Sequence, residues 1–194
     1  MWSAAVLAAS AFAVTAMAGG SNLHEVDAGR FYRSGQMGAD QLRETIDALG
    51  IRTIINLRGA RPEAGWYRDE AAVAREKGVR LISLRFDADR LPHRRELVKL
   101  LDAFRDAERP ILVHCQAGAD RSGLASAIYE MEYMGRPKRD ALEMLSLRYL
   151  HIDWLRPAGR YFIELYQGEP WARNSYHPCN GDYEYYDRDA YCGG

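Results

Sequence analysis

The chain has 194 residues, of which 47% are hydrophobic and 27% are charged, a balance typical of a globular domain with a sizeable core. Its formal net charge of −1 excludes the overall basic field found on many nucleic-acid-binding proteins, so we expect no nucleic-acid partner.

The N-terminal segment 1–18 is short, apolar and rich in alanine, and it ends in "AMA" at Ala18. Small residues in this pattern are typical of the cleavage site of a secretory signal, although no Lys or Arg precedes Arg30. The run is too short and too weakly apolar to predict a stable membrane span. We therefore expect a signal peptide or an N-terminal tether. A signal would give a periplasmic or secreted location; otherwise the location is cytoplasmic.

Strands and helices alternate along residues 29–167, which predicts one α/β domain with a mainly parallel sheet covered by helices on both faces. The first strand belongs to a hairpin-like piece that adds a mixed edge. Apolar and β-branched runs predict strands at 29–36, 51–57, 79–86 and 110–115. Apolar residues at helical spacing predict helices at 39–50, 66–77, 94–104, 123–135 and 157–167.

The chain after Gly168 contains Pro, Gly, Asn and many Tyr residues, which predicts an irregular Tyr-rich tail over 168–194. Two of the three cysteines, Cys179 and Cys192, lie in this tail. In an exported protein we expect them to pair as a disulfide and to leave Cys115 free. In a cytosolic protein they would be two unpaired thiols.

The stretch "ILVHCQAGADRSGLAS", residues 111–126, places Cys115 where a predicted strand stops and before a predicted helix begins. A helix N-terminus offers free N–H groups and a partial positive charge, and both stabilise an anion. The same environment favours the thiolate, which is the nucleophilic form of cysteine. The sequence therefore predicts a reactive Cys115 without an adjacent general base.

Five residues, most of them small, separate this cysteine from an arginine: Gln116, Ala117, Gly118, Ala119 and Asp120. A loop of small residues can curl and direct several N–H groups at one phosphate, and Gly118 can adopt backbone angles closed to other residues. Arg121 would then return over the same centre, where its planar guanidinium suits two phosphate oxygens. The hydroxyl of Ser122 could donate to the sulfur of Cys115 and help the thiolate to leave.

His114, Cys115, Arg121 and Ser122 match the pattern His-Cys, five residues, Arg, Ser or Thr. In this the chain resembles the cysteine-dependent protein tyrosine phosphatase superfamily. "FYRS" at 31–34 and "GADRSG" at 118–123 are similar to the dual-specificity branch, particularly to its exported bacterial members. The resemblance follows the order of elements over 29–167, as a dual-specificity-phosphatase-like catalytic domain, and its specific part is the loop. It implies a phosphocysteine intermediate and no metal or other cofactor.

The resemblance also implies roles for individual residues. His114 is expected to support the loop by hydrogen bonds, not to act as a general base. A general acid is expected on a loop upstream of the signature, and Asp89 in its "ADR" context is our first choice, with Asp87 second. Asp120 is a third candidate, as in some lipid phosphatases of the superfamily, and its alternative role is structural.

The predicted activity is therefore hydrolysis of phosphomonoesters by a protein-tyrosine or dual-specificity phosphatase. The expected partner is a phosphorylated protein, with phosphotyrosine first and phosphoserine or phosphothreonine tolerated, or a small phosphomonoester. One alternative is a phospholipid or other small-molecule phosphatase, although Gln116 and Ala119 stand where a highly charged head group would favour lysines. Another alternative is a phospho-anion-binding module with weak turnover.

Two further pairs of residues stay open at this stage. Arg58 and Arg61 follow a predicted strand and would line either the rim of the pocket or a solvated loop. Tyr32 and Arg33 precede the turn of the first predicted strand and are expected to have a structural role.

Overall fold

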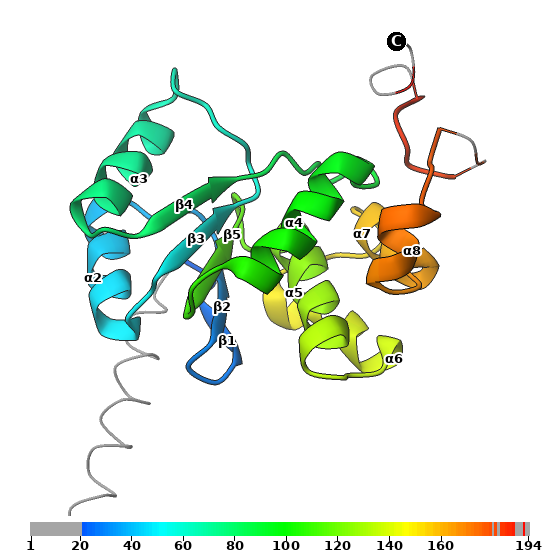
Figure 1. Ribbon diagram of the computed structural model, residues 1–194, viewed down its shortest axis with the longest axis horizontal. Coiled ribbons are helices and arrows are strands. Elements are labelled where there is room, and N and C mark those ends of the chain that lie inside the picture. The colour runs from blue at the N-terminus through cyan, green and yellow to red at the C-terminus, as the bar shows by residue number, and fades with distance from the viewer. Residues whose placement is uncertain (1–20, 180, 182, 189–191, 193–194) are drawn as a thin grey trace, which may run out of the picture.

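The computed structural model describes residues 21–179, 181, 183–188 and 192, so the predicted signal segment lies outside the described residues. Five strands form one sheet in the order β1-β2-β5-β3-β4 (Figure 1). Their bounds are β1 (His24–Asp27), β2 (Phe31–Ser34), β3 (Thr53–Asn56), β4 (Arg80–Ser83) and β5 (Ile111–His114). β1 pairs antiparallel with β2, and all the other pairs are parallel. The predicted α/β fold with a mixed edge is confirmed.

Helices cover both faces of this sheet, as Figure 1 shows. α2 (Ala39–Leu49) and α3 (Gly65–Glu76) lie on one face, and α4 (Arg94–Asp106) and α5 (Asp120–Tyr133) lie on the other. The remainder of the helical part lies on the α5 side and comprises α6 (Lys138–Ala141), η1 (Leu142–Met144), η2 (Leu147–Tyr149), α7 (Ala158–Leu165) and α8 (Glu169–Asn174).

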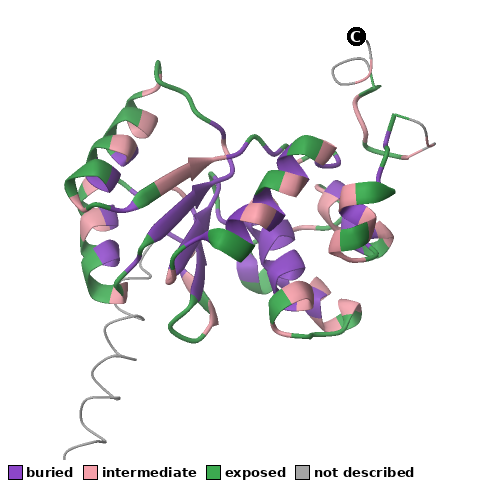
Figure 2. Ribbon diagram, viewed as in Figure 1, coloured by how far each residue is buried: buried purple, intermediate pink, exposed green. Residues whose placement is uncertain are grey.

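The period of two along each strand divides the core between the two faces. Tyr32, Ile54 and Leu112 pack with the apolar residues of α2 and α3. Phe31, Ile55, Ile111 and Val113 belong to the larger cluster, which includes α4 and α5. Figure 2 accordingly shows the inner strands β2, β3 and β5 and the inner sides of α4 and α5 as buried, whereas the edge strands β1 and β4 are partly exposed. With both faces covered, the strands read as apolar runs, which is why the sequence predicts them well.

Helix α5 begins at Asp120, three residues before the predicted start at residue 123. The segment after α5 is a chain of short turns, because α6, η1 and η2 each contain only three or four residues. No helix within the described residues has the length and apolar character needed to cross a membrane.

The prediction of an irregular tail over 168–194 is wrong at its start, because α8 (Glu169–Asn174) is helical. Pro170 lies in its first turn, where a missing N–H costs nothing. Ala172 and Tyr176 are fully buried, so this part of the tail belongs to the core. Apolar burial on the α7 side thus stabilises a helix that the local composition disfavours.

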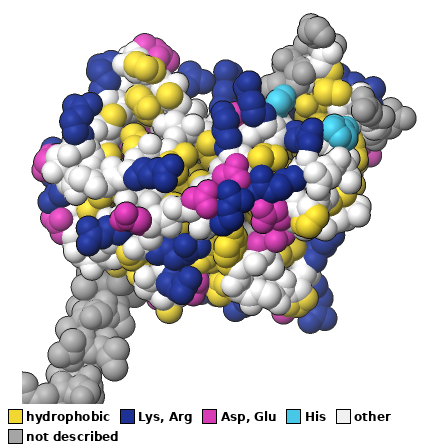
Figure 3. Space-filling view, viewed as in Figure 1, with side chains coloured by type: hydrophobic (Ala, Val, Ile, Leu, Met, Phe, Trp, Pro, Cys, Tyr) yellow, Lys and Arg dark blue, Asp and Glu magenta, His cyan; other side chains and the backbone are white. Residues whose placement is uncertain are grey.

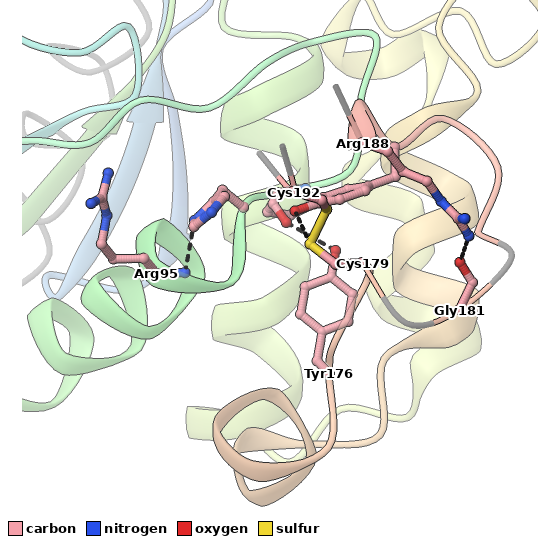
Figure 4. The surroundings of a disulfide bond; sticks show 9 residues. Arg95, Tyr176, Cys179, Gly181, Arg188 and Cys192 are labelled. Atoms are coloured by element: carbon pink, nitrogen blue, oxygen red, sulfur yellow. Dashed lines mark hydrogen bonds between the residues drawn. A yellow bond between two sulfur atoms is a disulfide. The ribbon is translucent and has the colours of Figure 1, made fainter. Parts of the chain in front are cut away.

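Cys179 and Cys192 form a disulfide in this structure, as expected for an exported protein, and Cys115 is free. The bridge closes a loop between residues 13 positions apart (Figure 4). Tyr176 anchors the chain just before this loop, because its hydroxyl donates to the carbonyl of Pro92 at 2.9 Å.

Candidate active site

The segment 115–119 joins the end of β5 to the start of α5, at the carboxyl edge of the parallel strands. Ligands of open α/β sheets bind at this edge. Cys115 follows β5 directly, and its side chain is 2% exposed. Its Sγ lies 3.5 Å from the Oγ of Ser122 in the first turn of α5. The structure therefore brings together the predicted nucleophile and the predicted hydroxyl donor.

The carbonyl groups of Gln116 and Ala117 accept hydrogen bonds from residues just after β2 and just before β1. The N–H of Gln36 donates to the carbonyl of Gln116 at 3.0 Å. The amide Nδ2 of Asn22 donates to the carbonyl of Ala117, also at 3.0 Å. These bonds tie the loop to the chain that precedes β1 and to the chain that follows β2.

The next two carbonyl groups are bound by Arg33, which is fully buried on β2. Its Nη2 donates to Gly118 at 2.7 Å and to Ala119 at 2.9 Å, and its Nη1 donates to the carbonyl of Met144 at 2.7 Å. Burial lowers the pKa of Arg33 to about 10, which leaves the group charged at neutral pH. The structural role expected for this residue is thus to fasten the loop.

These four bonds orient the other side of the loop as well. In a planar trans peptide, each N–H points opposite to the carbonyl of the preceding residue. The carbonyls of residues 116–119 are held by protein donors, so the N–H groups that follow them face the other way. Within the described part of the chain, the N–H groups of residues 117–119, which follow the first three of these carbonyls, donate to no protein acceptor. They are therefore available to an oxyanion beside Cys115.

Gly118 is required by the close approach of this loop to the end of β2. Its φ of +72° lies in the left-handed region, and a Cβ there would lie 2.5 Å from the nitrogen of Gly35. Gly35 is crowded in turn, because a Cβ on it would lie 3.1 Å from the backbone of Ala117. A side chain at residue 118 would therefore push the loop away from β2.

His114 is buried and engaged on the α3 side of the sheet. Its Nε2 contacts the carboxylate of Glu70, whose other oxygen accepts from Asn56 Nδ2 at 2.6 Å. Asn56 in turn accepts the N–H of Arg58 at 2.7 Å. This network fixes the ends of β5 and β3 relative to each other, and it fits the loop-supporting role that the resemblance implies.

Two neighbouring arginines, Arg121 in the first turn of α5 and Arg58 after β3, contribute positive charge to the site. The Nε of Arg121 is buried and, among the described residues, has no hydrogen-bond partner. Arg58 stacks over the ring of Trp66 at 3.7 Å and donates to Gln36 Oε1 at 3.0 Å. Burial and the neighbouring charge of Arg121 lower the pKa of Arg58. Two cations so close together stabilise an anion placed between them.

The three candidate acids gather around Arg156, which precedes α7. The side chain of Arg156 forms an ion pair with Asp89, and the charges of Asp120 and Asp87 also act on it. The hydrogen bond that Arg156 donates to Asp89 is the main reason that the pKa of Arg156 is raised. Asp87 holds the backbone of Asp89, since its carboxylate accepts the N–H of Asp89 at 2.8 Å.

Asp120 has a different set of contacts from the other two candidates. Its Oδ1 lies 2.8 Å from Nδ1 of His151, which is buried. The other ring nitrogen of His151 lies 2.9 Å from Asp153 Oδ1. Asp120 thus links the start of α5 to the segment between η2 and α7, which is a structural contact of the kind expected as its alternative role.

The loop that carries Asp87 and Asp89 is held from outside the domain core. The N–H of Leu91 donates to the carbonyl of Tyr185 at 2.7 Å, and Arg90 forms an ion pair with Asp187. Both partners belong to the tail closed by the disulfide. The tail therefore packs on the loop of the candidate acid.

Several residues of this site have no sequence signal of their own: Asn22, Glu70, His151 and Arg156. Each acts through a contact with a residue far along the chain, as between Asn22 and Ala117 or between Arg156 and Asp89. A sequence pattern within one segment gives no information about contacts between residues so far apart in the chain.

The chain is similar to known proteins both in sequence and in fold. Residues 5–151 match the model of a family described as "DSP-PTPase phosphatase fused to NAD+ Kinase". Dual specificity protein phosphatase TpbA of Pseudomonas aeruginosa (strain UCBPP-PA14) is 38% identical over 77 residues, which are 39% of this chain. The match spans 35%, about a third, of the length of that relative.

Solved structures with the same fold include three from two proteins. The crystal structure of P. aeruginosa TpbA has a TM-score of 0.60 at 24% identity, covering 79% of this chain and 89% of that one. A TpbA variant in complex with pTyr has a TM-score of 0.58 at 23% identity, covering 78% and 88%. The core catalytic domain of the PP-IP phosphatase SIW14 from S. cerevisiae, in complex with citrate, has a TM-score of 0.62 at 20% identity, covering 75% and 85%.

Proposed function

Because the chain belongs to the DSP-PTPase family whose model matches residues 5–151, we propose that it hydrolyses phosphomonoesters through a phosphocysteine intermediate on Cys115. One observation carries the proposal: the carbonyls of residues 116–119 are bound by protein donors, and among the described residues the N–H groups of residues 117–119, on the opposite side of these peptide units, have no protein acceptor. This is the arrangement that a phosphate needs beside a nucleophile at a helix N-terminus.

In the first step the thiolate of Cys115 attacks phosphorus, and the bond from phosphorus to the ester oxygen breaks. The loop N–H groups and the guanidinium of Arg121 bind the non-bridging oxygens as charge spreads over them. Asp89 donates a proton to the departing oxygen, so an alcohol or phenol leaves instead of its anion.

In the second step a water molecule attacks the phosphocysteine. The carboxylate of Asp89 now takes a proton from that water, and the bond between phosphorus and sulfur breaks. The Ser122 hydroxyl, 3.5 Å from Sγ, donates to the sulfur as its negative charge returns. Phosphate is released, and the thiolate is regenerated without a metal ion.

The substrate class follows from the relatives as well as from the site. The curated relative is named a dual specificity protein phosphatase, and a TpbA variant was solved with pTyr. We propose phosphotyrosine as the first substrate, with phosphoserine and phosphothreonine tolerated. A small-molecule phosphatase is the second candidate, because SIW14 is named a PP-IP phosphatase and shares the fold. A module that only binds phosphate would not need Cys115 and Ser122 together.

Hydrolysis of an aryl phosphate in the presence of a chelator tests this proposal. We expect turnover by the wild-type protein, and a loss of more than about 10⁴-fold in Cys115→Ser. The same variant should still bind inorganic phosphate, because the loop N–H groups and Arg121 are unchanged. Turnover by Cys115→Ser, or turnover that a chelator abolishes, would contradict the phosphocysteine route.

We also propose that segment 1–18 is a signal peptide or tether and that the protein is exported to the periplasm or secreted. The disulfide between Cys179 and Cys192 supports this location, because disulfides persist in oxidising compartments. The intact mass of the protein from fractionated cells, measured without reduction, tests it. A full-length, cytosolic and fully reduced protein would overturn the proposal.

A further inference from the structure

A hollow lies at the same edge of the sheet as the catalytic loop, formed by the loops that follow the neighbouring strands β3 and β4. Its volume is about 570 Å³, and it is lined by the loop after β3, the loop after β4 and the start of α4. Four arginines surround it: Arg58, Arg61, Arg85 and Arg95. In Figure 3, Lys and Arg side chains gather over the connection from β4 to α4.

The backbone brings two of these arginines together. Arg58 and Arg85 form an isolated antiparallel β-bridge beyond the ends of β3 and β4. Gly59 follows Arg58 and has a φ of +79°, a backbone conformation that favours glycine, and it packs against the side chain of Arg85. The cluster is thus a product of the fold and not only of an arginine-rich composition.

The acidic residues of the hollow do not neutralise these charges. Glu63 and Glu96 are the only carboxylates that line it among the described residues. Glu96 pairs with one of the four arginines, since its Oε1 lies 3.5 Å from Nε of Arg95, but the same oxygen also accepts from Lys99 at 2.9 Å and its Oε2 accepts the N–H of Arg85 at 3.1 Å. Burial alone would raise the pKa of Glu96, but these contacts outweigh it and lower the pKa. Glu96 is therefore ionised, and the hollow keeps a net positive charge.

Two of the arginines are free to bind a ligand. Over the described residues, the guanidinium groups of Arg61 and Arg85 make no hydrogen bond or ion pair, whereas the exposed Arg43 pairs with Asp40 and Glu76. An exposed arginine without a partner is common on protein surfaces. The distinguishing feature here is that such groups face one hollow.

The hollow is continuous with the catalytic site through Arg58. Arg58 lines the hollow, and its Nη1 donates to Gln36 Oε1 at 3.0 Å; the N–H of Gln36 donates in turn to the carbonyl of Gln116 in the catalytic loop at 3.0 Å. The catalytic loop itself carries no lysine, with Gln116 and Ala119 at its interior positions. The basic groups that a polyanion would need are therefore outside the loop, in the neighbouring hollow.

We propose that this hollow binds a second phosphate group of the substrate while the first phosphate lies against Cys115. The inference rests on the proposed function and narrows its substrate class to molecules with two phosphates. A phosphopeptide with a second phosphorylated residue and a small bisphosphate share this chemistry.

The test compares kcat/KM for matched pairs of substrates at low salt. One pair is a peptide with phosphotyrosine alone and the same peptide with a second phosphate on a neighbouring residue. The other pair is fructose 6-phosphate and fructose 1,6-bisphosphate. We expect the wild-type protein to prefer the bisphosphate of at least one pair by about tenfold or more, and salt to reduce this preference. The substrate pair that shows this preference tells whether the second phosphate comes from a phosphopeptide or from a small bisphosphate.

The decisive variant is Arg61→Ala/Arg85→Ala, in which the preference should fall to about onefold. Its matched control is Arg52→Ala/Arg80→Ala, which removes two neighbouring exposed arginines from the opposite ends of the same strands. The control should keep the preference. Equal kcat/KM for mono- and bisphosphates in the wild-type protein would overturn the inference. An equal loss of kcat/KM for mono- and bisphosphates in Arg61→Ala/Arg85→Ala would also overturn it.

A binding measurement separates this inference from the proposed function. The affinity of Cys115→Ser for the bisphosphorylated and monophosphorylated peptides does not depend on turnover. If the wild-type protein hydrolyses neither peptide but Cys115→Ser prefers the bisphosphorylated one, the proposed function fails and the second site stands. If Cys115→Ser binds the bisphosphorylated and the monophosphorylated peptide with equal affinity, the inference of a second phosphate site is wrong, whether or not the wild-type protein hydrolyses either peptide.

Discussion

Two loops at the same edge of the sheet are held in opposite ways. The catalytic loop, residues 115–119, is fastened by the fully buried Arg33 and by a close contact between Gly118 and Gly35. The loop of the candidate acid, residues 86–93, is buried in the core at Phe86 and Leu91, but between them Asp89 is exposed and is held by an ion pair with Arg156. The difference indicates that the phosphate-binding geometry is fixed before substrate arrives, whereas the proton donor is held by weaker contacts.

The largest effect is expected from the acid itself. Asp89→Ala should lower kcat by about 10²–10⁴-fold with phenyl phosphate, because its phenolate needs a proton to leave. The loss should be much smaller with p-nitrophenyl phosphate, whose nitrophenolate leaves readily without one. Steady-state rates with both substrates check this.

Two matched variants complete that measurement. Asp87→Ala should retain more activity than Asp89→Ala, and Asp120→Ala should act mainly by loosening the contact with His151. If Asp89→Ala is neutral and Asp120→Ala shows the leaving-group dependence instead, Asp120 is the acid and our assignment is wrong.

The next effect concerns the fastening of the catalytic loop. Arg33→Met should lower the free energy of unfolding by about 3 kcal/mol or more, because it leaves the carbonyls of Gly118, Ala119 and Met144 buried without a donor. Urea denaturation measures the loss. Binding of vanadate, which mimics the five-coordinate transition state, should weaken in parallel. An unchanged free energy of unfolding would show that the catalytic loop keeps its conformation without Arg33.

The smallest effect is expected at the loop of the candidate acid, when its partner arginine is also replaced by methionine. Arg156→Met removes an ion pair whose side chains are 40% and 55% exposed, so it should change the free energy of unfolding by less than about 1 kcal/mol. The pair of denaturation curves compares the two arginines directly. A loss as large as that of Arg33→Met would contradict the contrast between the loops.

The sequence predicted four of the five strands and the catalytic loop because their signals are local, but it missed the edge strand β1 (His24–Asp27), which lies before the predicted start of the domain at residue 29. Apolar runs mark strands buried on both faces, and the spacing of Cys115, Arg121 and Ser122 lies within eight residues. The start of α8 was also marked, by Gly168 and by Pro170 in a first turn, but the surrounding Tyr and Asn residues outweighed it.

Other parts of the site could not be predicted, because they depend on contacts between distant segments. Nothing near Arg33 shows that its side chain will reach the carbonyls of residues 118 and 119. The same holds for the pairing of Asp89 with Arg156 and for the hollow among Arg58, Arg61 and Arg85. These features arise only when strand order and loop packing are set.

The C-terminal tail has a practical consequence for anyone who assays this protein. A dithiol reductant keeps the sulfur of Cys115 from oxidising to a sulfenic acid. The same reagent can open the Cys179–Cys192 bridge, and the segment that the bridge closes touches Arg90 and Leu91 beside the proton donor. Rates recorded with and without dithiothreitol therefore describe two covalently different molecules, and each should be reported with its thiol count.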